Sequence, residues 1–421
     1  MPVYSIYNEA IKIASRAREA KGKLSGMSAS KKDAVLQAMA DLLLKTRDYI
    51  IKENAKDIKE AGAKKLSKAL IDRLILDKSR IITMSNSLRE IAALDNPLGE
   101  IIEMRQRPNG LKIGKLRIPI GVILIIYEAR PNVTSDCIGL CLKSGNALIL
   151  RGGSEALNSN IAIYKTLSSV SEKAGFPSGA INMVMTKDRK IIGELLSLTE
   201  YIDLCIPRGG ESLINEIAQS AKIPVIKHYK GVCHTYVDKY ASVDMALNIC
   251  YNAKVQRPGV CNAMETLLVH KDIASRFLPL TAALYKKANV ELRGCAKTRK
   301  ILKGIKEAKE ADWYEEYLDL ILSIKIVDNL DEAISHITKY GSSHSDAIVT
   351  NHYEHAMEFL HKVDSACVYV NASTRFTDGG QFGFGAEIGI STEKLHVRGP
   401  MGLKELMTYK YIIFGSGQVR E

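Results

Sequence analysis

The sequence has no long hydrophobic run, and its apolar stretches fall well short of the roughly 18 residues that a membrane-spanning helix needs. Cys-x-x-Cys pairs and zinc-finger spacings of cysteine and histidine are also missing, so we expect no metal. Residues 1–23 carry Glu9 and Glu19 and no continuous apolar core, which argues against a signal peptide or a transit peptide. These absences favour a cytoplasmic protein that does not act at a membrane.

Aromatic residues are scarce, at 6% of the chain, and they are not interleaved with basic residues. The net charge of +12 first suggests nucleic acid. However, the basic residues are spread along the chain, and no helix-turn-helix, RNP or zinc-knuckle pattern is present. Such a charge suits equally well a protein whose small ligands are anions, and we expect no nucleic-acid partner.

The eight cysteines are scattered along 421 residues. Without a secretion signal, this pattern indicates a reducing compartment, in which most cysteines serve as small apolar residues. We expect at most one of them to be a nucleophile.

Apolar periodicity divides the chain into a helical start and two α/β regions. Residues 1–98 have the pattern of helices, with a capping box from Ser30 to Asp33 and further helices near 47–61 and 66–94. The turn Asn109-Gly110 joins two short apolar runs, so 99–118 should form a β-hairpin. Short apolar runs then alternate with helices, which is typical of parallel, doubly wound sheets. The expected strands are 121–126, 147–150, 181–184, 201–206 and 225–228, then 235–237, 266–269, 324–327, 346–349, 367–370 and 407–414.

One cysteine lies in a distinctive motif, Arg-Pro-Gly-Val-Cys-Asn-Ala-Met-Glu-Thr at 257–266. The residues after Cys261 have the composition of a helix start, and a helix N-terminus together with Lys254 and Arg257 would lower the pKa of the thiol. The alternative is a buried, inert cysteine, which is the commoner fate of a lone cysteine.

Two further motifs each follow an expected strand. Tyr-Glu-Ala-Arg-Pro-Asn-Val-Thr at 127–134 offers the Asn132 amide to an oxyanion and Arg130 to a phosphate or carboxylate. Leu-Ile-Leu-Arg-Gly-Gly-Ser-Glu-Ala at 148–156 would bring backbone N–H groups to an anion. By itself, each is also compatible with an ordinary turn.

Glycine- and serine-rich loops occur at 340–346 and 379–391, and their glycines indicate that the loop backbone packs closely against a neighbouring group. His344 lies in the first loop and is a candidate base or substrate ligand, although a loop histidine more often caps a helix or packs.

Four segments together resemble the gamma-glutamyl phosphate reductases (glutamate-5-semialdehyde dehydrogenases), a branch of the aldehyde dehydrogenase superfamily. They are the three motifs above and Ala-Ile-Ser-His-Ile-Thr-Lys-Tyr-Gly-Ser-Ser-His-Ser-Asp-Ala-Ile at 333–348. The resemblance extends from the first helices to Lys410. It implies a Rossmann-like NADP-binding domain at 1–98 and 119–230, a second α/β domain for catalysis at 231–398, and a small β oligomerisation element at 99–118 and 399–421.

The resemblance also implies roles for individual residues. Cys261 would be the nucleophile, and Asn132 would donate to the oxyanion. Ser154 stands where relatives that prefer NAD carry a glutamate against the adenosine ribose, so this chain is expected to prefer NADPH. The remaining residues are expected to bind the cofactor (Arg151, Gly152, Gly209, Gly210 and Glu316) or the substrate (Arg130, Arg257, Arg375 and His344).

One departure from the wider superfamily is informative. Hydrolytic relatives carry Glu-Leu-Gly-Gly at the domain junction, where the glutamate activates water, whereas this chain has His-Tyr-Lys-Gly-Val beginning at His228. A thioester on Cys261 should therefore survive until it is reduced.

The implied activity is NADPH-dependent reduction of L-glutamyl 5-phosphate to L-glutamate 5-semialdehyde and phosphate, the second step of proline biosynthesis. The alternative is another superfamily member, acting on a semialdehyde or an acyl-CoA. A homo-oligomer is implied, and a contact with glutamate 5-kinase is left open.

Overall fold

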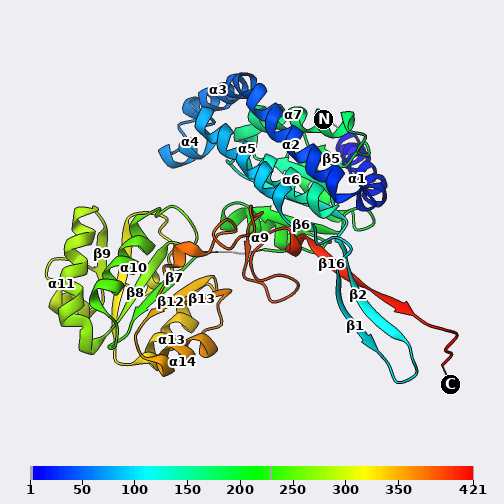
Figure 1. The fold of residues 1–421 in the computed structure, drawn as a ribbon. Coiled ribbons are helices and arrows are strands. Elements are labelled where there is room, and N and C mark those ends of the chain that lie inside the picture. The colour runs from blue at the N-terminus through cyan, green and yellow to red at the C-terminus, as the bar shows by residue number, and fades with distance from the viewer. Residues whose placement is uncertain (1–2, 228–229, 421) are drawn as a thin grey trace. The chain divides into compact units, whose positions relative to one another are not determined.

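The computed structural model describes residues 3–227 and 230–420, and contacts divide the chain into two compact units (Figure 1). The first unit comprises Met1–Lys227, Gly383–Gly389 and Met401–Glu421. The second comprises His228–Phe382 and Ile390–Pro400. The strands of the predicted β oligomerisation element are grouped with the first unit, and its role in oligomerisation stays a prediction.

The first unit begins with helices, as predicted, although two details differ. Ser28, rather than Ser30, caps the second helix by accepting a hydrogen bond from the backbone N–H of Lys31. The single helix expected over 66–94 is interrupted, because the Asn54 side chain binds the backbone of Leu74 and Leu76. The helices are α1 (Val3–Ser25), α2 (Ala29–Lys45), α3 (Arg47–Ala63), α4 (Lys68–Leu74) and α5 (Lys78–Ala93).

A parallel sheet forms the core of the first unit, in the order β5-β4-β3-β6. Its two central strands are buried along their whole length, which explains their continuous apolar sequence. The run expected at 225–228 contributes only a bridge between Val225 and Cys205, and residues 228–229 lie outside the described residues. The elements are β3 (Val122–Tyr127), α6 (Asn132–Ser144), β4 (Ala147–Gly152), the short helix η1 (Ser154–Ala156), α7 (Leu157–Lys173), β5 (Ile181–Met183), α8 (Lys190–Ser197), β6 (Leu204–Arg208) and α9 (Glu211–Ser220).

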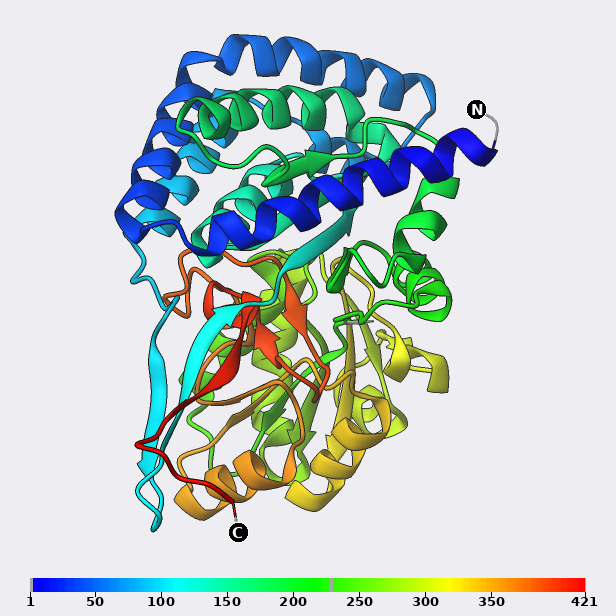
Figure 2. The same cartoon turned by 90° about the vertical axis from the view of Figure 1, so that its right-hand side faces the viewer.

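Helix α1 lies along one face of this sheet (Figure 2). Its buried side chains, Ile6, Ala10, Ala14 and Ala17, recur at helical spacing and pack with α8 and α9. Helix α6 packs on β3 and β4 and also against α7. The sheet is therefore covered on both faces.

An antiparallel sheet of β1 (Ile101–Gln106), β2 (Lys112–Pro119) and β16 (Met407–Phe414) extends from the first unit (Figure 1). The predicted hairpin is confirmed, and Gly110 provides the positive φ of its turn, +90°. Several large apolar side chains of this sheet are exposed: Ile101, Ile102, Met104, Tyr409, Tyr411, Ile413 and Phe414.

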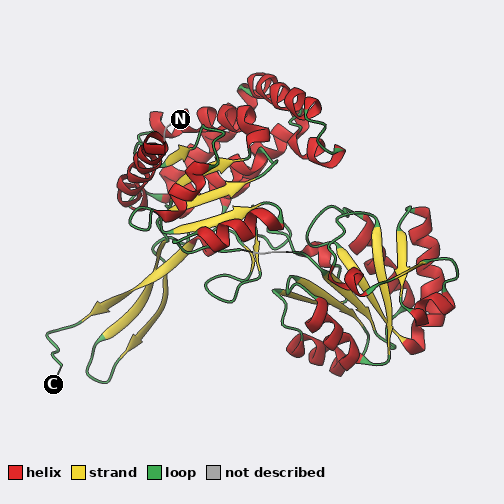
Figure 3. Ribbon diagram, turned by 180° about the vertical axis from the view of Figure 1, so that it is seen from behind, coloured by secondary structure: helices red, strands yellow, loops and turns green. Residues whose placement is uncertain are grey.

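The second unit is built on a parallel sheet in the order β10-β9-β11-β8-β7-β12-β13, with helices around it (Figure 3). Helices α10 and α11 pack on one face, and α13 and α14 on the other. Adjacent residues of β8 serve opposite faces, since Leu267 packs with the first pair of helices and Leu268 with the second. The predicted α/β class is confirmed in both units, although the sequence did not predict β9 and β10.

The elements of the second unit are β7 (Cys233–Val237), α10 (Val243–Val255), β8 (Met264–His270), α11 (Lys271–Lys287), β9 (Glu291–Gly294), α12 (Ala296–Ile301), β10 (Lys306–Glu307), η2 (Glu310–Tyr314), β11 (Ile321–Val327), α13 (Leu330–Tyr340), β12 (Ser345–Val349), α14 (Tyr353–Lys362), β13 (Cys367–Val370), η3 (Thr374–Phe376), β14 (Ile390–Ser391) and β15 (Gly399–Pro400). A last short helix, η4 (Lys404–Leu406), belongs to the first unit. Throughout residues 3–227 and 230–420, no helix combines the length and the apolarity that crossing a membrane requires.

Candidate active site

Cys261 lies in the turn between α10 and β8, and its side chain is partly exposed. The predicted helix start is wrong, because the residues from Met264 onward form β8. The C-terminus of α10 precedes the turn instead, so Cys261 does not lie at a helix N-terminus. Six of the other seven cysteines are buried, and only Cys295 is comparably accessible.

A buried ion pair joins the two elements that hold this turn. Lys254 Nζ lies 2.5 Å from Glu265 Oε2, and neither side chain is exposed. Burial raises the pKa of Glu265 to about 8 and lowers the pKa of Lys254. The charge of Lys254 is thus committed to Glu265, which corrects the prediction that Lys254 would stabilise the thiolate.

The backbone of Gly231 packs directly against the backbone of Cys261. A Cβ atom at position 231 would lie 2.0 Å from the carbonyl oxygen of Cys261 and 2.7 Å from its Cα. The Cys233 thiol donates to the same carbonyl oxygen at 3.1 Å. These contacts were not predictable from sequence motifs, because they join backbone segments about thirty residues apart.

On its other side, the turn is attached to the segment after β13. The Asn262 side chain donates to the carbonyl oxygen of Thr377 at 2.8 Å and accepts a hydrogen bond from Arg375. Arg375 Nε also donates to Gln256 Oε1 at 2.9 Å, so its guanidinium spans the two ends of the turn. Burial, and then the exposed Arg257 nearby, lower the pKa of Arg375. Two of the predicted anion-binding arginines therefore lie beside Cys261.

His344 is fully buried at the start of β12. Its Nδ1 lies 2.9 Å from Ser345 Oγ and 3.7 Å from Cys233 Sγ. A side chain with no exposed surface does not touch substrate in this conformation, so His344 belongs to the polar packing behind the turn. Its assignment as a substrate ligand stays a prediction.

Glu316 lies in the loop between η2 and β11 and is partly exposed. Its charge raises the pKa of Cys233 and of Glu265, in each case as a smaller contribution after burial. The loop thus brings a carboxylate near the residues that support Cys261.

In the first unit, the candidate cofactor residues lie at the ends of β4 and β6 or just after them, at the carboxyl edge of the parallel sheet, where α/β proteins bind ligands. Arg151 is buried, and its Nε has no hydrogen-bond partner among the described residues. Burial, followed by the nearby Arg189, lowers the pKa of Arg151. Its Nη1 donates to the carbonyl oxygen of Gly152 at 3.2 Å, so Nε is the unpartnered donor of a guanidinium that fits an anionic group such as the phosphate of a dinucleotide.

The backbone at this edge is tightly packed. A Cβ on Gly152 would lie 2.2 Å from the Asn160 amide, and one on Gly209 would lie 2.5 Å from the Glu128 carboxylate. Gly210 donates its backbone N–H to Glu128 at 2.8 Å and caps α9. The predicted glycines are therefore positions where a side chain does not fit or where the backbone itself makes the contact.

Glu155 is a residue that sequence reasoning missed. Its Oε1 accepts a hydrogen bond of 2.6 Å from the backbone N–H of Ala129, which has a φ of +41°. A positive φ is unfavourable for alanine, so this carboxylate helps to hold the turn in place. The turn carries Arg130 and leads to Asn132, the exposed first residue of α6, whose amide donates to Asp136 at 3.2 Å. Partly exposed Ser154, which precedes Glu155, opens η1.

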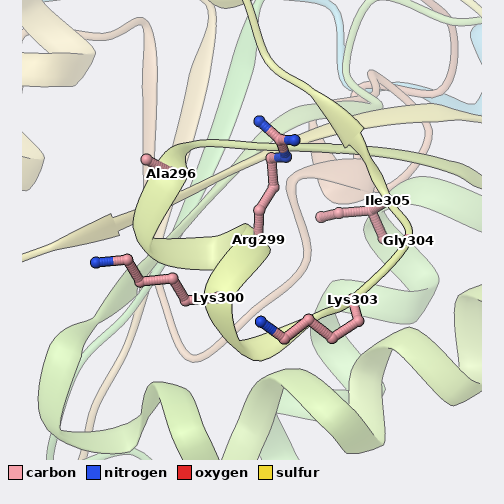
Figure 4. Close-up of a pocket in the computed structure, with 6 residues that line it drawn as sticks. All are labelled: Ala296, Arg299, Lys300, Lys303, Gly304 and Ile305. Atoms are coloured by element: carbon pink, nitrogen blue, oxygen red, sulfur yellow. The ribbon is translucent and has the colours of Figure 1, made fainter.

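The second unit also has a basic hollow of about 420 Å³, formed by α12 and the turn after it (Figure 4). Arg299, Lys300 and Lys303 supply its charge. The residues named above around the Cys261 turn do not include any that line this hollow.

Known proteins match both the sequence and the fold. The model of the aldehyde dehydrogenase family matches residues 5–319. A gamma-glutamyl phosphate reductase of Caldanaerobacter subterraneus subsp. tengcongensis is 56% identical over 408 residues, covering 97% of this chain and 99% of that protein. One from Clostridium novyi is 54% identical over 416 residues, covering 99% and 100%.

Solved structures agree. The crystal structure of gamma-glutamyl phosphate reductase from Thermotoga maritima matches with a TM-score of 0.95 at 46% identity, covering 98% of this chain and 100% of that one. An acetylating aldehyde dehydrogenase from Geobacillus thermoglucosidasius, 16% identical, matches over 99% of each chain with a TM-score of 0.72 and shares the fold. The predicted aldehyde dehydrogenase-like fold is confirmed.

Proposed function

Because the chain belongs to the aldehyde dehydrogenase family and, within it, to the gamma-glutamyl phosphate reductases, we propose that it reduces L-glutamyl 5-phosphate to L-glutamate 5-semialdehyde and phosphate. This reaction is the second step of proline biosynthesis. The observation that carries the proposal is the 56% identity over nearly the whole chain, together with one partly exposed cysteine on a tightly held turn.

Cys261 is assigned as the nucleophile. Its thiolate attacks the acyl carbon, a carbon–sulfur bond forms, and the bond to the phosphate oxygen breaks, which leaves a thioester and inorganic phosphate. The Asn132 amide and the backbone N–H of Cys261 are assigned to the oxyanion, where one donor is commonly worth about 3 kcal/mol. Arg130 and Arg257 are assigned to the departing phosphate.

An enzyme of this family takes a nicotinamide cofactor, and we assign NADPH. When bound, the cofactor supplies the hydride that converts the thioester to the aldehyde. Arg151 is assigned to the 2′-phosphate because its buried Nε has no partner among the described residues. A hydroxyl at Ser154, where a carboxylate would repel that phosphate, supports the same choice. At Gly152, Gly209 and Gly210, the protein backbone is assigned to contact the cofactor, and Glu316 is assigned to the nicotinamide ribose.

Water should compete poorly for the thioester, because position 228 is a histidine where water activation would need a carboxylate. Without a positioned base, hydrolysis loses about 10²–10⁴-fold. His228 lies outside the described residues, so this assignment rests on the sequence.

The test is NADP⁺ reduction with L-glutamate 5-semialdehyde, measured with and without phosphate. We expect phosphate to be required, arsenate to replace it, and coenzyme A not to do so. Reduction that depends on coenzyme A would instead identify an acyl-CoA reductase. Rapid formation of free glutamate without phosphate, lost in His228→Ala, would show that the histidine activates water.

The exposed apolar side chains on β1 and β16, such as Ile102 and Tyr411, support a homo-oligomer formed through this sheet. A contact with glutamate 5-kinase, which makes the unstable acyl phosphate, is part of the same proposal. We place the reaction in the cytoplasm.

A further inference from the structure

A small hollow lies beside the Cys261 turn in the second unit. Its volume is about 300 Å³, and it is formed by the C-terminal half of α10 and the segment after β13. The lining combines one guanidinium, one carboxylate, three amides and one aromatic ring: Arg375, Asp378, Asn252, Gln256, Gln381 and Phe376.

Arg375 belongs both to this hollow and to the support of Cys261. It donates to Gln256 on one side and to Asn262, the residue after Cys261, on the other. A molecule seated in the hollow therefore lies next to the nucleophile's own turn. Among the described residues, the hydrogen-bond acceptors of this guanidinium are neutral amide oxygens, and the nearby charge of Asp378 acts on it electrostatically.

Asp378 provides the opposite charge. Its Oδ1 accepts hydrogen bonds from the backbone N–H groups of Gly380 at 3.0 Å and Gln381 at 3.2 Å, which fixes the direction of the carboxylate. Phe376 is 48% exposed and supplies an apolar surface between polar groups. The hollow thus presents a cation, an anion and an apolar wall to one small ligand.

The acyl carbon of the substrate is three carbon–carbon bonds from an α-carbon that carries an ammonium and a carboxylate. We propose that this hollow binds that zwitterionic end. Arg375, with the amides of Asn252 and Gln256, receives the carboxylate, Asp378 and the Gln381 carbonyl receive the ammonium, and Phe376 contacts the methylene groups. The inference rests on the proposed function, and it assigns Arg375, which was predicted to bind the substrate, to the carboxylate.

The test is Asp378→Asn, which keeps Oδ1 for the two backbone hydrogen bonds and removes only the charge. Two aldehydes are compared in the phosphate-dependent oxidation: L-glutamate 5-semialdehyde, and 5-oxopentanoate, which lacks the amino group. We expect kcat/KM to fall about 10-fold for the first, mainly through KM, and to stay unchanged for the second. Asp244→Asn, at the exposed first turn of α10, should change neither.

Unchanged activity with 5-oxopentanoate also shows that Asp378→Asn is folded. An equal loss with both aldehydes, or no loss with either, would overturn the assignment of Asp378 while leaving the proposed function intact. If the unmodified enzyme oxidised neither aldehyde in the presence of phosphate, the proposed function and this subsite would both fail.

Discussion

All nine histidines of the chain fall in the second unit, and the first unit has none. The cysteines also distinguish the two units. Burial raises the pKa of Cys137, Cys141 and Cys205 in the first unit, whereas Cys261 and Cys295, the two that are partly exposed, are in the second. The first unit offers backbone groups and a permanently charged arginine, which suit an anionic ligand. The second offers groups that gain and lose protons, which suit covalent chemistry.

The largest expected effect tests whether the covalent chemistry belongs to one residue of the second unit. Cys261→Ala should lower turnover by about 10⁴-fold or more, because no other accessible nucleophile lies on that turn. NADPH binding, measured by fluorescence titration, should persist, since the assigned phosphate contacts are in the first unit.

Cys295 is the matched control. Burial alone would raise the pKa of its thiol, but hydrogen bonds from Thr298 and from the backbone of Ile326 and Lys297 lower it overall. The lowered pKa makes Cys295 a competitor of Cys261 for iodoacetamide, so activity is the deciding measurement, and Cys295→Ala should keep full activity. Loss of activity in Cys295→Ala, with Cys261→Ala still active, would reverse the assignment.

A second test compares glycines in the two units. Gly231→Ala places a methyl group against the Cys261 backbone, and a displaced nucleophile should lose about 100-fold in kcat. Gly193→Ala, in α8 of the first unit, meets nothing within 4 Å and should leave kcat unchanged. A fully active Gly231→Ala enzyme would show that the Cys261 turn can shift to accommodate the methyl group without loss of activity.

The first unit is tested by its cofactor preference. Ser154→Glu puts a carboxylate near the assigned 2′-phosphate and should shift the ratio of kcat/KM for NADPH and NADH by about 10-fold toward NADH. Ser220→Glu, at the exposed end of α9, serves as the control. If both variants keep the original ratio, another loop selects the phosphate.

The smallest effect concerns the histidines of the second unit. Burial, followed by the charges of His234, Lys325 and Lys339, lowers the pKa of His336 from 6.5 to about 2. Because the folded pKa lies below the unfolded value, the stabilisation is present above pH 6.5 and is lost as the pH falls. The free energy of unfolding should decrease by up to about 1.4 kcal/mol per pH unit below that point.

Urea unfolding can be followed through Trp313, the single tryptophan, whose ring lies 5.2 Å from that of His336. In His336→Phe, the free energy of unfolding should depend less steeply on pH. If the free energy of unfolding of this variant depends on pH as steeply as that of the unmodified protein, another residue causes the pH dependence.

Local signals predicted much of the fold. The Asn109-Gly110 turn and the apolar run 407–414 correspond to the hairpin and β16, because turn chemistry and alternation act over a few residues. The segment directly after Cys261 was predicted to start a helix, since Ala, Met and Glu favour helices, whereas the strand predicted at 266–269 is confirmed. In the structure, burial between two layers of helices decides in favour of a strand.

The candidate site was predictable only in part. Motifs identified Cys261, Arg151 and Arg375, but not what holds them. Gly231 and Glu155 act through backbone contacts with residues distant in the sequence, and such contacts leave no periodic signal. Histidine is a residue type that can bind substrate, but tertiary packing buries the side chain of His344, and the sequence does not show that burial.

The buried Lys254–Glu265 pair has a consequence for heating. Both side chains are fully buried, so the hydrogen bond between them breaks only when α10 and β8 separate. Since the pair lies on the two elements that flank Cys261, the turn between them should keep its geometry until those elements separate. Thermal inactivation should then coincide with unfolding of the second unit, with no earlier loss of activity from a loosened turn.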